Sequence, residues 1–93
     1  NMTTPKIAVV TGANRGLGFE ISRQLAKKGY QVILTSRDEA KGKAADEKLQ
    51  SEGLDVIYYH LDVTSDESSQ KLAEFINQQF ERLDVLVNNA GIY

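Results

Sequence analysis

The sequence predicts an α/β fold in which a parallel β-sheet carries helices on its faces. Short apolar runs alternate with longer amphipathic segments along the chain, which is the order that strand–helix–strand crossovers produce. The apolar runs are continuous and do not alternate with polar residues, as expected for strands covered on both faces. A glycine-rich segment stands between the first strand and the first helix, and it marks the expected ligand site.

Length and composition indicate one small folded domain. The chain has 93 residues, of which 41% are hydrophobic and 26% charged, as is ordinary for a globular protein. A net charge of -2 gives no reason to expect a nucleic acid or a membrane surface as a partner. The absence of cysteine excludes a disulfide scaffold, a thiolate metal site and a cysteine nucleophile. It also suits a reducing compartment, so we expect a cytoplasmic protein.

Hydrophobic patterning places the elements along the chain. Strands are expected at residues 6–10, 32–35, 56–61 and 85–87, and helices at residues 16–28, 38–52 and from 64 or 65 to about 81. Each predicted helix has an apolar face expected to meet the sheet. In the first helix this face carries Leu17, Ile21, Leu25 and Ala26, and in the second Ala40, Ala44, Ala45 and Leu49. In the third helix it carries Leu72, Ala73, Phe75, Ile76 and Phe80. Right-handed crossovers give the strand order 3-2-1-4, the N-terminal half of a doubly wound, Rossmann-type sheet.

Residues 11–18 read Thr-Gly-Ala-Asn-Arg-Gly-Leu-Gly and join the first strand to the first helix. Gly12 can make the turn out of the strand, Gly16 allows a pyrophosphate to approach the backbone, and Gly18 allows close helix packing. A glycine pattern alone could also be a turn that binds nothing. The strongly patterned strand and helix on either side favour a dinucleotide site. The loop lacks the Gly-Lys-Ser/Thr ending of a P-loop, which disfavours ATP or GTP hydrolysis.

The end of the second strand indicates which dinucleotide binds. NAD sites place an acidic residue there, whereas NADP sites replace it and supply a cation for the 2′-phosphate. Ser36 stands where the acid would be expected, Arg37 follows it, and Arg15 is a second cation in the glycine loop. This combination favours NADP, with Lys41 as a weaker candidate for the same phosphate. The alternative is that Arg37 is a solvated charge at the strand end, free to pair with Asp38 or Glu39.

Together these motifs resemble the short-chain dehydrogenase/reductase family. Thr-Gly-x-x-x-Gly-x-Gly at 11–18, Asp-Val at 62–63 and Asn-Asn-Ala-Gly at 88–91 occur in order and at suitable separations. The runs 14–16, 34–38 and 61–63 are most similar to the carbonyl-reductase-like branch. The resemblance covers the whole chain as the N-terminal part of such an enzyme. It implies an NADPH-dependent oxidoreductase that reduces small-molecule ketones or aldehydes.

The resemblance also implies roles for individual residues. Asp62 would hydrogen-bond the adenine amino group and the backbone of Val63 would read the ring edge, although a turn or helix-capping Asp62 is the alternative. The backbone near residues 89–91 would lie against the adenosine ribose, and Asn88 and Asn89 are expected to tie neighbouring strands together. The complete candidate set for cofactor binding is Gly12, Asn14, Arg15, Gly16, Leu17, Gly18, Arg37, Asp62, Val63, Asn89, Ala90 and Gly91.

Three residues of the third strand are expected to be structural. Tyr58 and Tyr59 should lie on opposite faces of the sheet and fill space there. His60, the single histidine of the sequence, has no partner Ser or Asp at a telling spacing. It is expected to be a packed or surface residue of the strand.

The catalytic residues that the resemblance implies are absent from this chain. The family uses a Tyr as general acid, a Lys that lowers the pKa of that Tyr, and a Ser that orients the carbonyl, yet no tyrosine here has a Lys four positions later. We therefore expect residues 1–93 to be a partial NADP-binding domain of a longer single-domain enzyme, without catalytic or metal-binding residues of its own. An open edge at residues 85–87 would invite an oligomer. The alternatives are a non-catalytic NADP-binding or sensing module, and a structural fragment that assembles through that edge.

Overall fold

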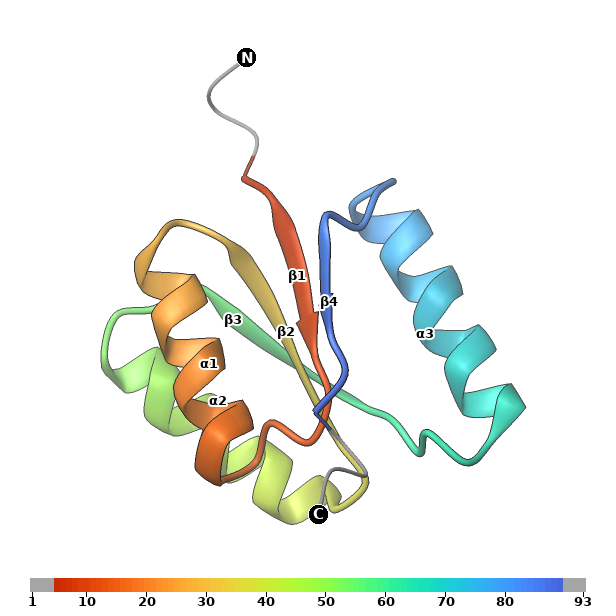
Figure 1. Ribbon diagram of the computed structural model, residues 1–93, viewed down its shortest axis with the longest axis horizontal. Helices are drawn as coiled ribbons and strands as arrows, with labels where there is room; N and C mark the ends of the chain where they lie inside the picture. The colour runs from red at the N-terminus through yellow and green to blue at the C-terminus, as the bar shows by residue number, and fades with distance from the viewer. Residues whose placement is uncertain (1–4, 90–93) are drawn as a thin grey trace.

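The computed structural model describes residues 5–89, which form one parallel sheet with helices on both faces (Figure 1). The elements are β1 (Ile7–Val10), α1 (Gly16–Lys27), β2 (Gln31–Ser36), α2 (Glu39–Ser51), β3 (Val56–His60), α3 (Asp66–Gln79) and β4 (Val85–Val87). The strand order is β3-β2-β1-β4 and every neighbouring pair is parallel. The predicted fold class and strand order are confirmed.

The sheet is covered by α1 and α2 on one face and by α3 on the other (Figure 1). Successive residues of β1 and β2 contribute to opposite faces, because side chains alternate along a strand. Val10 and Leu34 pack with α1 and α2, whereas Val9 and Ile33 pack with α3. Every residue of β1 and β2 is buried, which explains why the apolar runs are continuous in the sequence. Between residues 5 and 89, no helix has both the length and the apolar character needed to cross a membrane.

The face of α1 that meets the sheet differs from the prediction. Its buried residues are Gly18, Ser22 and Ala26, whereas Leu17 is 67% exposed. Placing Leu17 on the inner face was therefore wrong. The helix approaches the sheet so closely that only small residues fit on the contact line, and the larger Ile21 and Leu25 flank it half-buried.

Three alanines of α2 and α3 were also misplaced, whereas Ala45 is buried as predicted. The buried residues of α2 are Gly42, Ala45 and Leu49, while Ala40 and Ala44 are exposed. In α3 the buried residues are Leu72 and Ile76, and Ala73 is exposed. Alanine suits both sides of a helix because it favours helix formation with little side chain to bury, so it does not mark the inner face.

Helices α2 and α3 begin one or two residues later than predicted, because a capping residue stands just before each of them. The Asp38 carboxylate accepts a hydrogen bond from the Lys41 N–H (3.0 Å), and the Ser65 hydroxyl accepts one from the Ser68 N–H (3.2 Å). Of the two predicted caps of α3, Ser65 is the one used. At the far end of α3, Glu81 adopts a φ of 64°, which ends the helical path before it.

An ion pair on the surface joins α1 to the end of α2. The Arg23 guanidinium donates from Nε and Nη2 to the two carboxylate oxygens of Glu52, each at 2.8 Å. Arg23 also lies 4.9 Å from the centre of the Phe19 ring. The hydrogen bonds from Arg23 lower the pKa of Glu52 from its ordinary value of 4.5, so this two-pronged contact stabilises the folded state only while Glu52 is ionised.

Arg23→Gln is expected to lower the melting temperature at pH 7. Arg23 also forms an ion pair with Glu20, and the pKa values of both Glu52 and Glu20 are lower in the folded protein than in the unfolded chain. The two ion pairs of Arg23 therefore contribute their full stability above about pH 4.5, the unfolded pKa, and that contribution is lost as the pH falls through the folded pKa values. Thermal unfolding followed by circular dichroism at several pH values should show the difference between wild type and variant shrinking in acid.

Lys43→Gln is the matched control, because it also removes one positive charge from an ion pair. Lys43 and Glu39 lie 3.5 Å apart and both side chains are more than half exposed, so little stability should be lost. If the difference in melting temperature between wild type and Arg23→Gln did not depend on pH, the role of the ion pair would be contradicted.

Candidate nucleotide-binding cleft

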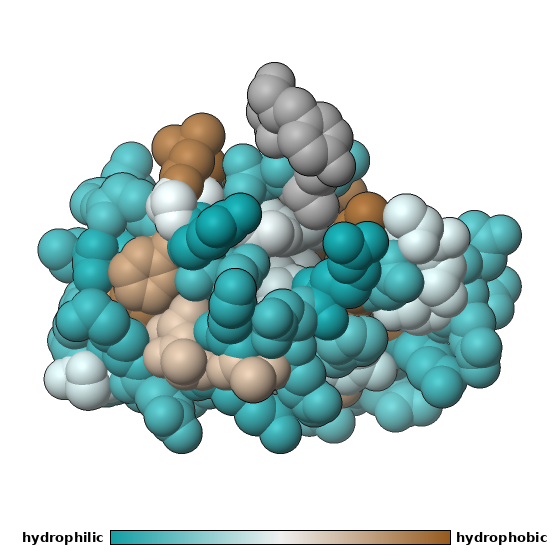
Figure 2. Space-filling model, turned by 90° about the horizontal axis from the view of Figure 1, so that it is seen from below, coloured by the Kyte–Doolittle hydropathy of each residue, from teal (hydrophilic) through white to brown (hydrophobic). Residues whose placement is uncertain are grey.

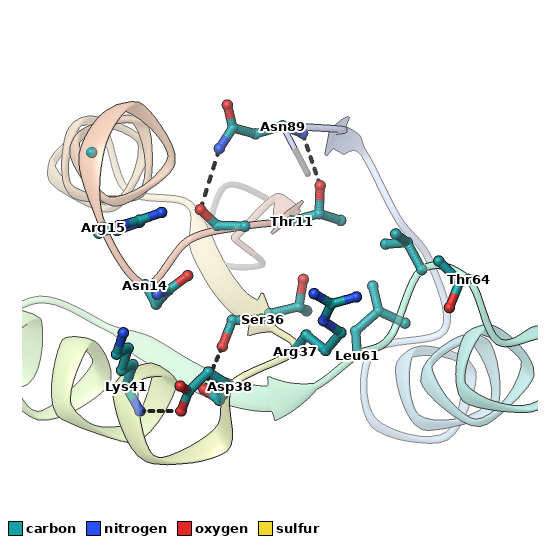
Figure 3. A pocket seen from close by; sticks show the side chains of 14 residues that line it. Thr11, Asn14, Arg15, Ser36, Arg37, Asp38, Lys41, Leu61, Thr64 and Asn89 are labelled. Carbon is teal, nitrogen blue, oxygen red and sulfur yellow. Dashed lines mark hydrogen bonds between the residues drawn. The ribbon is translucent and has the colours of Figure 1, made fainter. Parts of the chain in front are cut away.

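The carboxyl ends of the strands open onto a cleft of about 620 Å³ (Figure 3). This volume lies within the range of small-molecule sites. Hydrophilic residues predominate on this end of the molecule (Figure 2). The cleft is lined by Thr11, Gly12, Asn14, Arg15, Gly16, Thr35, Ser36, Arg37, Asp38, Lys41, Leu61, Val63, Thr64 and Asn89.

The glycine loop exposes the start of α1 to this cleft. Gly12 and Gly16 adopt φ values of 61° and 60°, a backbone region that favours glycine. Arg15, which precedes the helix, is extended and makes no side-chain hydrogen bond to the first turn. Between residues 5 and 89, α1 is the one helix without such a cap, since α2 and α3 both have one. The first N–H groups of α1 are therefore suited to an anionic ligand.

Gly18 and Asn89 hold the glycine loop against the end of β4. A Cβ on Gly18 would contact the Gly12 carbonyl and lie 2.7 Å from the Asn89 amide nitrogen. Asn89 donates from its side chain to the Gly12 carbonyl (3.2 Å) and from its N–H to the Thr11 hydroxyl (2.8 Å; Figure 3). The Thr11 hydroxyl lies 3.3 Å from the Asn88 side-chain oxygen. The prediction that Asn88 and Asn89 tie neighbouring strands is confirmed.

Three cationic side chains reach the cleft from different elements (Figure 3). Arg15 comes from the glycine loop, Arg37 from the residue after β2, and Lys41 from the first turn of α2. Within the described part of the chain, no ion pair joins any of them to a carboxylate. The Asp38 carboxylate is directed to the start of α2 as its cap. Arg37 thus forms no ion pair with Asp38 or Glu39, and since its side chain is exposed, the predicted alternative of a solvated charge at the strand end stays open.

Ser36, which the sequence predicts to replace the acidic residue of an NAD site, is the last residue of β2. Its side chain is almost fully buried, with 3% of the residue exposed, and its hydroxyl donates to the Asp38 carbonyl at 2.9 Å. The end of β2 therefore presents a neutral, internally bonded side chain to the cleft, followed at once by the Arg37 guanidinium.

Asp62 serves the turn between β3 and α3. One of its carboxylate oxygens accepts hydrogen bonds from the Thr64 hydroxyl (2.6 Å) and the Thr64 N–H (3.0 Å). These bonds, together with the positive charge of Arg37, lower the pKa of Asp62. The carboxylate lines a second hollow along β3 and not the cleft. The turn role is thus present, and contact with adenine stays a prediction.

The structure brings most of the predicted site residues together. Those that line the cleft are Gly12, Asn14, Arg15, Gly16, Arg37, Val63 and Asn89. Leu17, Gly18 and Asp62 do not line it, although Gly18 supports the loop from behind. Ala90 and Gly91 lie outside the described residues. The lining residues that the sequence did not single out are Thr11, Thr35, Leu61 and Thr64; their place at or just after strand ends was the available signal.

A glycine loop and an uncapped helix, placed where the strand order reverses, define an α/β protein with a Rossmann-type fold. Residues 6–93 match the sequence family described as short chain dehydrogenase. The chain belongs to this family.

The chain is similar to longer reductases. It is 55% identical to (+)-neomenthol dehydrogenase of Arabidopsis thaliana, over 96% of this chain and 31% of that protein. It is 48% identical to carbonyl reductase [NADPH] 3 of Rattus norvegicus, over 94% of this chain and 32% of that protein. The solved structure of menthone neomenthol reductase from Mentha piperita aligns with a TM-score of 0.90 at 50% identity, over 97% of this chain and 33% of that one. The chain thus spans about a third of the length of these relatives.

Structural likeness alone leaves the cofactor open. A metagenomic short-chain oxidoreductase in complex with NADP aligns with a TM-score of 0.87 at 37% identity, over 94% of this chain and 39% of that one. A Burkholderia phymatum dehydrogenase/reductase in complex with NAD aligns with a TM-score of 0.82 at 29% identity, over 88% of this chain and 29% of that one. The choice between the two cofactors must come from the residues of the cleft.

Thr11→Val is expected to destabilise the protein by about 0.5–1.5 kcal/mol, the net contribution of a typical hydrogen bond, because the Asn89 N–H keeps a second acceptor in the Val87 carbonyl at 3.2 Å. Valine keeps the shape of the side chain but removes the oxygen that accepts from the Asn89 N–H. Thr11→Ser keeps that oxygen and should lose much less. Urea unfolding of both variants measures the difference, and a loss with Thr11→Ser but none with Thr11→Val would show that the methyl group, not the hydrogen bond, matters.

Proposed function

We propose that this chain is the cofactor-binding portion of an NADPH-dependent oxidoreductase that reduces ketones or aldehydes. In this proposal residues 1–93 are a partial NADP-binding domain of a longer cytoplasmic protein. The observation that carries it is the juxtaposition, in one cleft, of the uncapped start of α1 with Arg15 and Arg37. The names of two similar proteins, carbonyl reductase [NADPH] 3 and (+)-neomenthol dehydrogenase, support the reaction class.

The residues of the cleft suit a dinucleotide phosphate. The N–H groups at Gly16 and Leu17, with the positive end of the α1 dipole, would hold the pyrophosphate beside Gly12 and Asn14. Val63 and residues 89–91 would border the adenosine, with Asp62 as the predicted partner of the adenine amino group. When bound, NADPH supplies the hydride that reduces a carbonyl carbon.

The preference for NADP over NAD rests on charge at the end of β2. A ribose 2′-phosphate would meet no acidic side chain at Ser36, and the Asp38 carboxylate is engaged at the start of α2. Arg37 and Arg15 supply guanidinium groups whose planar geometry suits phosphate oxygens. Lys41, at the rim of the same cleft, would add a third positive charge.

The remainder of the proposed enzyme lies beyond the cofactor half. No tyrosine of these 93 residues has a Lys four positions later, and the similar proteins are about three times as long. We therefore place the Ser, Tyr and Lys that act on the carbonyl, and the pocket for the substrate, in the rest of a longer chain. The apolar edge of β4, where Leu86 is 60% exposed, suits either a further strand of that chain or a second subunit.

Arg37→Asp in the full-length protein should weaken NADPH binding at least tenfold and leave NADH binding within about twofold. Losing one charge-assisted hydrogen bond costs about 1.5–3 kcal/mol, which corresponds to a tenfold to hundredfold change in affinity. Titration of both cofactors, followed by NAD(P)H fluorescence, measures the two dissociation constants. Equal weakening of the two cofactors would exclude a role at the 2′-phosphate.

Lys6→Asp is the control for a general change of charge. Lys6 precedes β1, at the opposite end of the strand from the cleft, so both affinities should stay near wild type.

A turnover assay distinguishes an enzyme from a non-catalytic sensing module. With a cyclic ketone such as menthone, the wild-type full-length protein should consume NADPH, whereas a non-catalytic module would bind the cofactor without consuming it.

A further inference from the structure

Three consecutive carbonyl groups after β2 each accept a hydrogen bond from a side chain. The Tyr58 hydroxyl donates to the Ser36 carbonyl at 3.1 Å. The His60 Nε2 lies 3.0 Å from the Arg37 carbonyl, and the Ser36 hydroxyl donates to the Asp38 carbonyl at 2.9 Å. The Ser36 and Asp38 carbonyls also accept main-chain N–H groups, from Leu61 at 3.1 Å and from Gly42 at 2.9 Å. Side chains, two of them from β3, therefore add to the main-chain hydrogen bonds on both sides of Arg37.

The register of the sheet explains why β3 supplies two of these donors. Tyr58 pairs with Leu34 and His60 pairs with Ser36 in the parallel ladder. Residues two apart on a strand share a face of the sheet, so both side chains stand beside the end of β2 on the same side. A carbonyl oxygen only accepts, so His60 contributes an Nε2–H. Burial raises the pKa of the Tyr58 hydroxyl, which keeps it protonated and able to donate.

Gly42 brings the first turns of α2 onto the same support. A Cβ on Gly42 would contact the Tyr58 ring and would lie 2.6 Å from the Ser36 hydroxyl oxygen. The helix therefore packs directly on Tyr58, and Lys41 is the residue beside this contact. Residues 36–42 form one segment whose inner side rests on β3 and whose outer side carries Arg37 and Lys41 into the cleft (Figure 3).

We propose that Tyr58 and His60 are positioning residues that set the preference for NADPH over NADH, by fixing the main chain that carries Arg37. This inference rests on the proposed function, since it requires the 2′-phosphate to be bound by Arg37. Neither Tyr58 nor His60 lines the cleft; both line the hollow along β3 on the other side of the segment. They act through Arg37 and make no contact with the ligand.

The physical reason is preorganisation. An arginine side chain loses conformational freedom when it binds a phosphate, and a main chain that is also mobile adds to that loss. Hydrogen bonds to the three carbonyls fix the main chain before the ligand binds. They therefore remove the entropy cost of ordering the main chain during binding. The benefit falls only on a ligand that Arg37 contacts, so a ligand without the 2′-phosphate should bind equally well with or without the support.

Tyr59 provides a matched control on the neighbouring position of β3. Its ring lies 4.7 Å from the ring of Phe75, on the face of the sheet that α3 covers. Its hydroxyl donates to the Lys71 carbonyl at 3.3 Å and has no contact with residues 36–42. Tyr59→Phe therefore removes a tyrosine hydroxyl from the same strand without touching the segment that carries Arg37.

Isothermal titration of the full-length protein with adenosine 2′,5′-bisphosphate and with adenosine 5′-monophosphate tests the proposal. Tyr58→Phe and His60→Leu should each weaken the bisphosphate about three- to tenfold, as expected for the loss of one hydrogen bond. Binding of the monophosphate should stay within about twofold. His60→Gln keeps an N–H donor and should recover part of the loss, while Tyr59→Phe should change neither affinity.

The outcomes separate this inference from the proposed function. Equal weakening of both nucleotides by Tyr58→Phe and His60→Leu would show a general structural role and overturn the inference, as would bisphosphate binding unchanged from wild type. A wild-type protein that binds the two nucleotides equally would overturn the proposed NADP preference itself, and the inference with it. Melting temperatures of all variants identify any loss that reflects unfolding; Tyr58→Phe keeps the ring that packs on Gly42.

Discussion

The close contact between α1 and the end of β1 controls both the fold and the cleft. Gly18 lies so near the Gly12 carbonyl that any side chain at position 18 would collide with it. That approach restricts the rest of the contact line to small residues, Ser22 and Ala26. It also points the uncapped start of the helix at the ends of the strands, where Asn89 from β4 bonds the same carbonyl. The packing of the helix and the position of its N–H groups thus have one cause.

The second organised region is the segment after β2, which carries charge to the cleft without neutralising it. Asp38 is close in sequence to Arg37 and Lys41, yet its carboxylate is used to cap α2. A cap satisfies an otherwise unpaired N–H and favours a negative charge at the helix start. The segment therefore contains an acidic residue while presenting two cations to the cleft. The same residues build the helix start and shape the electrostatics of the site.

Much of this organisation could be predicted from residue patterns. The apolar runs at residues 6–10 and 32–35 predicted the two central strands, and the glycines at 12, 16 and 18 predicted the strand-to-helix turn. These features depend on local backbone requirements and on burial, which the residue types report directly. The inner faces of the helices were predicted less well, because Ala40, Ala44 and Ala73 are exposed. Helical periodicity locates an apolar stripe, but it cannot say which small residues meet the sheet.

The sequence by itself determined the fold class, the strand order, the family and the location of the cleft at the ends of the strands. These follow from patterns of neighbouring residues and from the fixed hand of parallel crossovers. Only the tertiary structure decided which residues meet across the chain: Asn89 with Gly12, and Tyr58 and His60 with the main chain around Arg37. Such contacts depend on strand register and on how closely the helices approach the sheet. Both are set by packing of the whole domain and not by local residue patterns.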